Sequence, residues 1–322
     1  MYLLVIIFLL VSCMSPKITD SNFDAVIELD SGEIEVIVEE PEMNIETFEE
    51  WLTEHSDYST DLLRQDLLGG SFGGVESTQD SITHIPIIFV HGNSDRATGG
   101  DFGGWKKLRE QFLEHGYTSA ELYGTTYGSA DPGDSSSYTH REEFVLQVRH
   151  HMEAVLAYTE APKIHVISHS LGVTMARQAI LGGEGFNDDG HRFTIGPSLR
   201  DKISVFIGIA GANQGLSQCY GSFMPICSVQ NGLYPGSWNG LEVVGMSHFL
   251  QQLNTHMHYE GQKVYSIWGD SDEILGYRCL VWGMNSCQLP GQDGEASFEG
   301  LGHFELRDET FGIMYDWIVN SE

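Results

Sequence analysis

The sequence predicts an α/β fold, in which a mostly parallel sheet carries helices on both faces. Short apolar runs rich in β-branched residues alternate along the chain with longer segments whose apolar residues recur at helical spacing. Such alternation of strands and helices is typical of a parallel sheet that is covered on both sides. The chain has 322 residues, a length that suits one large α/β domain or two smaller domains.

Residues 1–15 are expected to form a signal peptide. The run M-Y-L-L-V-I-I-F-L-L-V is apolar but short, since a helix that spans a bilayer needs about 20 residues. No Lys or Arg precedes this run, which departs from the usual signal pattern. Lipid attachment at Cys13 and retention of the segment as an anchor are the alternatives. We therefore expect a secreted protein, or a lipid-anchored one, with no transmembrane span.

Residues 16–80 are expected to form an acidic N-terminal extension with a hairpin and a helix. Apolar and acidic residues alternate over 22–40 around the turn D-S-G, which favours a β-hairpin. Residues 44–55 place their apolar side chains on one helical face. A glycine-rich stretch at 69–80 leads into the main domain. The extension could pack on the main domain or cover its active site, and the sequence favours neither arrangement.

The main domain is expected to cover residues 81–322. Strands are predicted where β-branched and other apolar residues form short runs, over 85–90, 120–123, 164–167, 203–209 and 264–268. Helices are predicted where apolar residues recur at helical spacing, over 105–115, 141–158, 171–181 and 310–320. This order of strands and helices is that of a parallel α/β domain.

The composition argues against several classes of partner. Acidic residues outnumber basic ones by 46 to 16, so the formal net charge is −30. This charge disfavours nucleic acid and anionic membrane surfaces as partners, because both attract Lys and Arg. Neither C-x-x-C nor H-E-x-x-H occurs in the chain, so we predict no metal site and no cofactor. The oligomeric state is not indicated by the sequence.

Four cysteines remain when Cys13 is removed with the signal peptide. An even number in a secreted chain indicates two disulfides, for which three connectivities exist. We favour the local pairs Cys219–Cys227 and Cys279–Cys287, because each pair closes a short loop. Four reduced thiols are the alternative, which an oxidising compartment disfavours.

The stretch K-I-H-V-I-S-H-S-L-G at 163–172 predicts a nucleophilic serine. In a nucleophile elbow, a serine occupies the tight turn between a buried strand and a helix, with small residues two places before and after it. Only Ser170 meets this condition, with Gly172 after it and Ser168, in place of the usual glycine, before it. Ser168 is expected to pack within the sheet. An ordinary strand-to-helix turn is the alternative.

A serine hydroxyl needs a base, and the base needs a carboxylate that orients it. In folds with this elbow the acid follows a later strand, and the histidine follows the acid. We predict Asp272 as the acid, since G-x-x-D is the usual placement, and keep Asp270 as the alternative. We predict His303 as the base, because it lies in a glycine-containing loop just before the last helix. His169, next to the nucleophile, is expected to have a packing role.

Two backbone N–H groups are predicted to form an oxyanion hole, whose donors stabilise negative charge on a carbonyl oxygen. One is the amide of Leu171, at the start of the helix that follows the elbow. The other is the amide of Asn93, in the loop H-G-N-S-D directly after the predicted strand I-P-I-I-F-V.

Residues 211–261 are expected to form a cap over the site. They lie between two predicted strands, in a connection far longer than the usual length of about 2–6 residues. An insertion after the carboxyl end of a strand lies on the substrate side of such a sheet. Phe223, Trp238 and Phe249 are the candidate contacts for an acyl chain. A stabilising excursion with its own small core is the alternative.

Several stretches within residues 80–320 together resemble the class 2 lipases, and among them the secreted lipases of roundworms. They read I-I-F-V-H-G-N-S-D, A-E-L-Y-G-T-T-Y-G, F-I-G-I-A-G-A-N-Q-G-L-S-Q-C, C-L-V-W-G, L-P-G-Q-D-G-E and G-H-F. The chain is more distantly similar to extracellular polyhydroxybutyrate depolymerases. The resemblance implies an α/β-hydrolase fold with Ser170 as nucleophile, Asp272 as acid and His303 as base. Ser168 and the acidic extension depart from the family pattern.

The resemblance implies a secreted carboxylic ester hydrolase that acts through an acyl-enzyme, with triacylglycerol as the expected substrate. An extracellular depolymerase of polyesters such as polyhydroxyalkanoates is the alternative among enzymes. The alternative that is not an enzyme is a catalytically inactive lipid-binding homologue. The intact Ser170, Asp272 and His303 argue against it.

Overall fold

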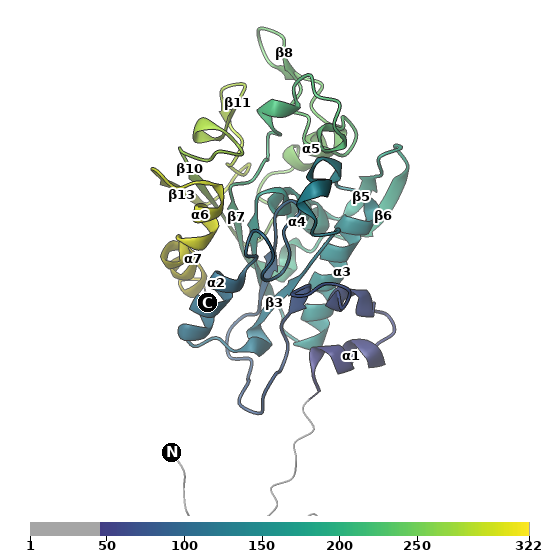
Figure 1. Cartoon of the computed structure of the whole chain (residues 1–322), viewed down its shortest axis with the longest axis vertical. Coiled ribbons are helices and arrows are strands. Elements are labelled where there is room, and N and C mark those ends of the chain that lie inside the picture. Colours follow the sequence, from purple (N-terminus) through teal and green to yellow (C-terminus); the bar gives the residue numbers. More distant parts are fainter. Residues whose placement is uncertain (1–45, 322) are drawn as a thin grey trace, which may run out of the picture. The chain divides into compact units, whose positions relative to one another are not determined.

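A seven-stranded sheet forms the centre of the structure, a computed structural model that describes residues 46–321 (Figure 1). In spatial order the strands are β1 (Ser71–Phe72), β3 (Leu122–Thr125), β2 (Ile87–Val90), β4 (Ile164–His169), β7 (Ile203–Ile209), β10 (Lys263–Gly269) and β13 (Gly294–Phe298). All neighbours pair in parallel except β1, which is antiparallel to β3. The expected α/β fold with a mostly parallel sheet is confirmed.

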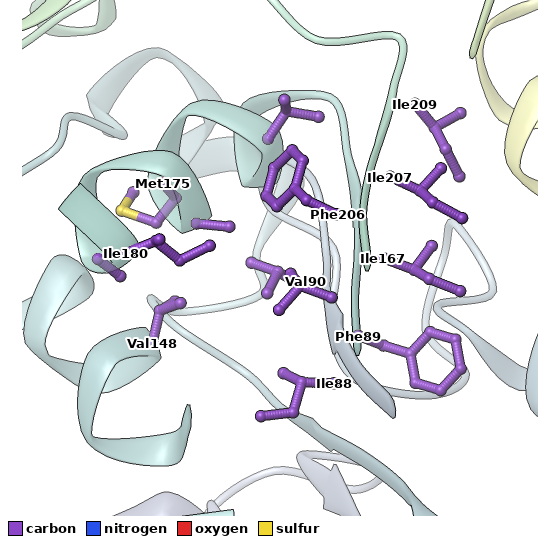
Figure 2. Packing of buried hydrophobic residues seen from close by; sticks show 14 of the residues in the cluster. Ile88, Phe89, Val90, Val148, Ile167, Met175, Ile180, Phe206, Ile207 and Ile209 are labelled. Atoms are coloured by element: carbon purple, nitrogen blue, oxygen red, sulfur yellow. The ribbon is translucent and has the colours of Figure 1, made fainter. Parts of the chain in front are cut away.

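Apolar side chains on both faces of the sheet explain why helices cover both sides. The side chains of Ile88, Val90 and Phe206 point toward α3 (Glu142–Tyr158) and α4 (Leu171–Leu181), as Figure 2 shows. Their neighbours in sequence point to the opposite face, because side chains alternate along a strand. Figure 2 shows this for Phe89 and Ile207.

The second face is covered by α2 (Lys106–Glu114), α6 (His303–Asp308) and α7 (Phe311–Val319). The Phe89 ring meets Phe112 of α2 with ring centroids 6.0 Å apart. On the same face, Tyr265 of β10 stacks on Trp317 of α7 at 4.4 Å. Both faces of the central strands are therefore dry, as their continuous apolar sequences require.

The start of the described chain extends the same sheet. Helix α1 (Phe48–Glu54) begins at Thr47, whose hydroxyl accepts from the Glu50 amide while the Glu50 carboxylate accepts from the Thr47 amide. The Phe48 ring packs on Tyr158 of α3 at 5.1 Å. A short 3₁₀ helix (Thr60–Leu63) and β1 follow, so residues 46–80 pack against the main domain. The signal peptide and the hairpin expected at 22–40 lie outside the described residues.

The insertion between β7 and β10 has little regular structure. It contains α5 (His248–Asn254), the two-residue strands β8 (Ser237–Trp238) and β9 (Val243–Val244), and two 3₁₀ turns, Ser217–Cys219 and Pro225–Cys227. The two turns are joined by the Cys219–Cys227 disulfide. A hairpin of β5 (Gly183–Phe186) and β6 (Arg192–Gly196) follows α4. The insertion and the short strand β11 (Leu280–Val281) lie at one end of the sheet, in the upper part of Figure 1.

The connection from β10 to β13 also contacts the insertion. It carries the hairpin β11 (Leu280–Val281) and β12 (Met284–Asn285), which is closed by the Cys279–Cys287 disulfide. The Asn213 amide donates to the Ser286 carbonyl at 2.8 Å, and the Tyr220 and Trp282 rings meet edge to face at 5.0 Å. Both expected local disulfides are thus confirmed.

The predicted helices and strands of the main domain all occur, with ends that shift by a few residues. Strand β13 is missed by the sequence because G-E-A-S-F has only half-buried side chains at alternate positions and no apolar run. The hairpins β5–β6 and β11–β12 are missed because they too lack a continuous apolar run. None of the helices in residues 46–321 is long and apolar enough to cross a bilayer.

Candidate active site

Ser170 lies on a strained turn between β4 and α4. Its backbone has φ 58° and ψ −127°, a conformation that costs a non-glycine residue about 1–3 kcal/mol. Small neighbours make room for this turn. A Cβ atom at Gly172 would overlap the carbonyl oxygens of Val90 and His91, and one at Gly92 would lie 3.0 Å from the Ser170 Cβ. The end of β2 therefore passes directly beside the serine.

The other serine of the motif faces into the sheet. Ser168 is fully buried, and its hydroxyl donates to the Ile207 carbonyl at 3.2 Å. It stands opposite Gly208 in the register of β4 and β7. The serine in place of the usual glycine is accommodated because its hydroxyl has an acceptor and its strand neighbour has no side chain.

Asp272 and His303 form a buried pair. The His303 Nδ1–H donates to Asp272 Oδ2 at 2.7 Å, and both residues are 2% exposed. The other oxygen, Oδ1, accepts from the amides of Ile274 at 2.9 Å and Leu275 at 2.7 Å. These bonds fix the carboxylate, and the carboxylate fixes the tautomer of the imidazole. A neutral His303 then has its lone pair on Nε2.

Two further carboxylates hold the loop that leads into α6. His303, which the sequence places in a loop, is instead the first residue of this short helix, which precedes the last helix α7. Asp270 Oδ1 accepts from the Gly300 amide at 3.0 Å, and Glu273 Oε2 accepts from the His303 amide at 2.9 Å. The Gly300 amide holds the pKa of Asp270 below its usual value. Asp270, the alternative acid, thus contacts the loop rather than the imidazole. The role of Glu273 is missed by the sequence analysis, and only its place directly after Asp272 could have suggested it.

His169 brings the elbow and the predicted base together. Its Nε2–H donates to the His303 carbonyl at 3.0 Å, and the two rings are 4.6 Å apart. Burial lowers the pKa of His169 well below its usual value, so the ring is neutral. Since Ser170 is the next residue, His303 lies beside the elbow, although the two are far apart in the sequence.

The loop after β2 carries the second predicted oxyanion donor. His91 is buried, its Nδ1–H donates to the Gly92 carbonyl at 2.7 Å, and its Nε2 accepts from the Tyr127 amide at 3.0 Å. Burial lowers the pKa of His91 to about 3, so it is a neutral support for the loop. The Asn93 side chain donates to the Ser135 carbonyl at 2.9 Å. Leu171 begins α4, so its amide has no acceptor within the helix.

The three candidate substrate contacts differ in exposure. Phe223 is fully exposed and Trp238 is half exposed, whereas Phe249 is only 3% exposed. The Phe249 ring stacks on His140 at 3.7 Å, inside the base of the insertion. Phe249 thus packs in the base of the insertion, and its contact with an acyl chain, like those of Phe223 and Trp238, stays a prediction.

No group of three or more His, Cys, Asp or Glu side chains in residues 46–321 is arranged to hold a metal ion. The polar groups described above are instead paired with one another or with backbone amides. The arrangement joins a hydroxyl on a strained turn, a buried imidazole–carboxylate pair and a loop of backbone donors. Such a set is suited to nucleophilic attack on a carbonyl group.

Comparisons with known proteins agree with this chemistry. A family model described as lipase (class 2) matches residues 84–316. Lipase BlEst2 of Bacillus licheniformis in its propeptide form is similar with a TM-score of 0.51 at 15% identity, over 78% of this chain and 54% of that chain. Its mature form gives 0.51 at 16% identity, over 78% and 99%.

Lipase B of Aspergillus fumigatus is similar with a TM-score of 0.50 at 15% identity, over 78% of this chain and 56% of that chain. The chain thus spans about half the length of that lipase and of the propeptide form. At these identities the likeness is one of fold. No curated protein matches the chain by sequence.

Proposed function

The chain belongs to the class 2 lipase family of ester hydrolases, and from this premise we propose that it hydrolyses lipid esters with Ser170, His303 and Asp272 as a catalytic triad. The observation that carries the proposal is the buried hydrogen bond from His303 to Asp272, next to a serine on a strained turn. Triacylglycerol is the proposed substrate, and no cofactor takes part.

The proposed reaction has two acyl-transfer steps. Ser170 Oγ attacks the ester carbonyl carbon while His303 Nε2 takes the hydroxyl proton. The ester C–O bond then breaks, the leaving alcohol receives that proton, and the acyl group stays on Ser170. Water, deprotonated by the same nitrogen, then attacks the acyl carbon. The bond from this carbon to Ser170 Oγ breaks, Ser170 Oγ takes the proton back from His303, and the carboxylic acid is released. The Asp272 carboxylate stabilises the imidazolium that forms in each step.

The amides of Asn93 and Leu171 are proposed to bind the oxyanion of each tetrahedral intermediate. Support for this role comes from Gly92, which brings the end of β2 against the elbow, and from the position of Leu171 at the start of α4. One such donor is worth about 2.7–4 kcal/mol of transition-state stabilisation. The hydrogen bonds of His91 hold the loop in place before substrate binds.

Exposed apolar side chains favour a lipid or polyester over a small soluble ester. In the insertion and in the connection that contacts it they include Tyr220, Phe223, Met224, Trp238, Leu241 and Tyr277. An extracellular polyester depolymerase is the second candidate, because the same surface suits an apolar polymer. Secretion, or lipid anchoring through Cys13, is proposed in either case, and the two disulfides are compatible with it.

Ester hydrolysis by wild type and Ser170→Ala tests the proposal. We expect Ser170→Ala to lose about 10⁴-fold or more in kcat/KM on p-nitrophenyl butyrate. Emulsified long-chain triacylglycerol and a polyhydroxybutyrate film, assayed side by side, then separate lipase from depolymerase. Lipid binding without hydrolysis by the wild type would instead support an inactive lipid-binding homologue.

A further inference from the structure

A buried ion pair joins α6 to the loop that follows β2. Arg307 Nη1 donates to Asp95 Oδ2 at 2.8 Å, and the two side chains are each 2% exposed. The pair joins residues that are far apart in the sequence. Neither residue belongs to the proposed triad or oxyanion hole, so the reaction described above makes no use of them.

The pair connects the two halves of the site. Asp95 follows Asn93 by two residues, and its amide donates to the Gly92 carbonyl at 3.3 Å in the same turn. Arg307 follows His303 by one turn of α6, and residues four apart lie on the same face of a helix. A displacement of the loop that carries Asn93 would therefore also displace α6, the helix that begins with His303.

Further contacts make this connection stiff. Arg307 Nη2 donates to the Phe102 carbonyl at 2.8 Å, and the Phe102 and Phe304 rings stack at 5.0 Å with an angle of 7°. The guanidinium also lies 5.9 Å from the centre of the Trp105 ring. The chain from Asp95 to Trp105 is thus fastened to α6 by a charge pair, a carbonyl and two ring contacts.

Arg307 keeps a second carboxylate that does not belong to the loop. Its Nε donates to Asp308 Oδ1 at 2.6 Å, and the Asp308 side chain is 30% exposed. Loss of Asp95 would leave Arg307 paired, whereas loss of Asp308 would leave the connection to the loop intact. Burial raises the pKa of Asp95, and the positive charge of Arg307 acts in the opposite direction.

We propose that Asp95 and Arg307 are positioning residues, which hold the Asn93 amide at a fixed distance from His303 during acyl transfer. The inference rests on the proposed function. A donor displaced by about 1 Å can cost about 100-fold in rate. A pair that serves only stability would change the melting temperature and leave the rate of the folded enzyme unchanged.

Two matched variants test this inference, Asp95→Asn and Asp308→Asn. Each removes one carboxylate from Arg307, but only Asp95→Asn removes the charge pair that joins Arg307 to the oxyanion loop. On p-nitrophenyl butyrate, well below the melting temperature, we expect Asp95→Asn to lower kcat about 10- to 100-fold with KM changed less than about 2-fold. We expect Asp308→Asn to keep kcat within about 2-fold of wild type.

A double variant gives an independent readout. If Arg307 acts through Asp95, Asp95→Asn combined with Arg307→Lys lowers kcat no further than the stronger single variant. Multiplication of the two separate losses would overturn the inference. If Asp95→Asn does not fold, Arg307→Lys is tested alone. Lysine keeps the positive charge but lacks the planar guanidinium, so this variant is expected to lower kcat at unchanged KM.

The failure of this inference is distinguishable from that of the proposed function. If Ser170→Ala abolishes hydrolysis and Asp95→Asn keeps wild-type kcat, the inference is wrong and the triad stands. If Ser170→Ala retains wild-type activity, the proposed function is wrong, and the inference falls with it. Equal losses of kcat in Asp95→Asn and Asp308→Asn would also overturn the positioning role.

Discussion

Two neighbouring regions of the molecule are built in opposite ways. One is the rim of the candidate active site, formed by the loops that carry Asp95 and Asp272 and by the start of α6, and the other is the insertion between β7 and β10. At the rim, charged and polar side chains are buried and paired, as in Asp272 with His303 and Asp95 with Arg307. In the insertion, large apolar side chains such as Phe223 are exposed. Under the proposed function the difference separates two tasks. The fixed polar groups would carry out the chemistry, and the exposed apolar surface would contact a water-insoluble substrate.

The base of the insertion, like the rim, contains buried and paired polar side chains, whereas the tips of the insertion do not. Arg177 on α4 is fully buried and donates to Glu260 at 2.8 Å and to Asn213 at 3.0 Å. These partners lie at the two ends of the insertion. The insertion is thus anchored to the helix that follows Ser170, while the apolar side chains at its tips are exposed.

The largest expected effect concerns the two aspartates after β10. Asp272→Asn should lower kcat by about 10⁴-fold, because the amide would favour the wrong tautomer of His303. Asp270→Asn is the matched control, since the Asp270 carboxylate contacts the Gly300 amide rather than the imidazole. Its kcat should fall by less than about 10-fold. Steady-state kinetics on a soluble ester would contradict the assignment if Asp270→Asn were the more damaging change.

Arg177→Met tests the anchor of the insertion. It leaves the Glu260 carboxylate buried without its partner, which is expected to cost about 3–5 kcal/mol of unfolding free energy. Arg192→Met is the control, because Arg192 pairs with Glu184 on the surface, where such pairs are worth about 0–1 kcal/mol. Urea unfolding measures both. Equal midpoints for the two variants would show that the buried pair is not an anchor.

His140 gives the base of the insertion a dependence on pH. Burial lowers its pKa to about 3, from 6.5. In the unfolded chain the His140 imidazole is protonated below pH 6.5, whereas in the folded protein it is protonated only below about pH 3. The free energy of unfolding therefore falls as the pH is lowered from 6.5 to about 3. His140→Gln should reduce the slope of unfolding free energy against pH by up to about 1.4 kcal/mol per pH unit. An unchanged slope within this window, measured by urea unfolding, would contradict this.

The smallest expected effect lies at the tips of the insertion. Phe223→Ala and Trp238→Ala should lower the rate on emulsified long-chain triacylglycerol several-fold and leave the rate on soluble p-nitrophenyl butyrate unchanged. Loss of exposed aromatic surface weakens contact with an apolar phase without disturbing the rim. An unchanged ratio of the two rates would remove the insertion from substrate contact.

Local signals explain which parts the sequence could predict. The elbow, the strands with continuous apolar runs and both disulfides follow from short patterns, such as small residues around Ser170 and cysteines eight residues apart. The family resemblance is confirmed by the match over residues 84–316. Strand β13 lacks an apolar run, so its place at the sheet edge depends on pairing with β10.

Contacts between distant loops could not be predicted. Arg307 stands on a helix where an arginine is usually exposed, and its partner Asp95 is 212 residues away. Phe223 and Phe249 are alike as residues of one insertion, yet the first is exposed and the second is buried against His140. In each case tertiary structure decides what the residue type leaves open.

Covalent labelling with a fluorophosphonate tests the central claim most directly. The reagent reacts with an activated serine, and its adduct is located by mass spectrometry of peptides. We expect one adduct, on the peptide that contains Ser170, with no labelling of Ser170→Ala and much slower labelling of His303→Ala. Labelling of the active enzyme at another serine, or at an unchanged rate without His303, would contradict the account.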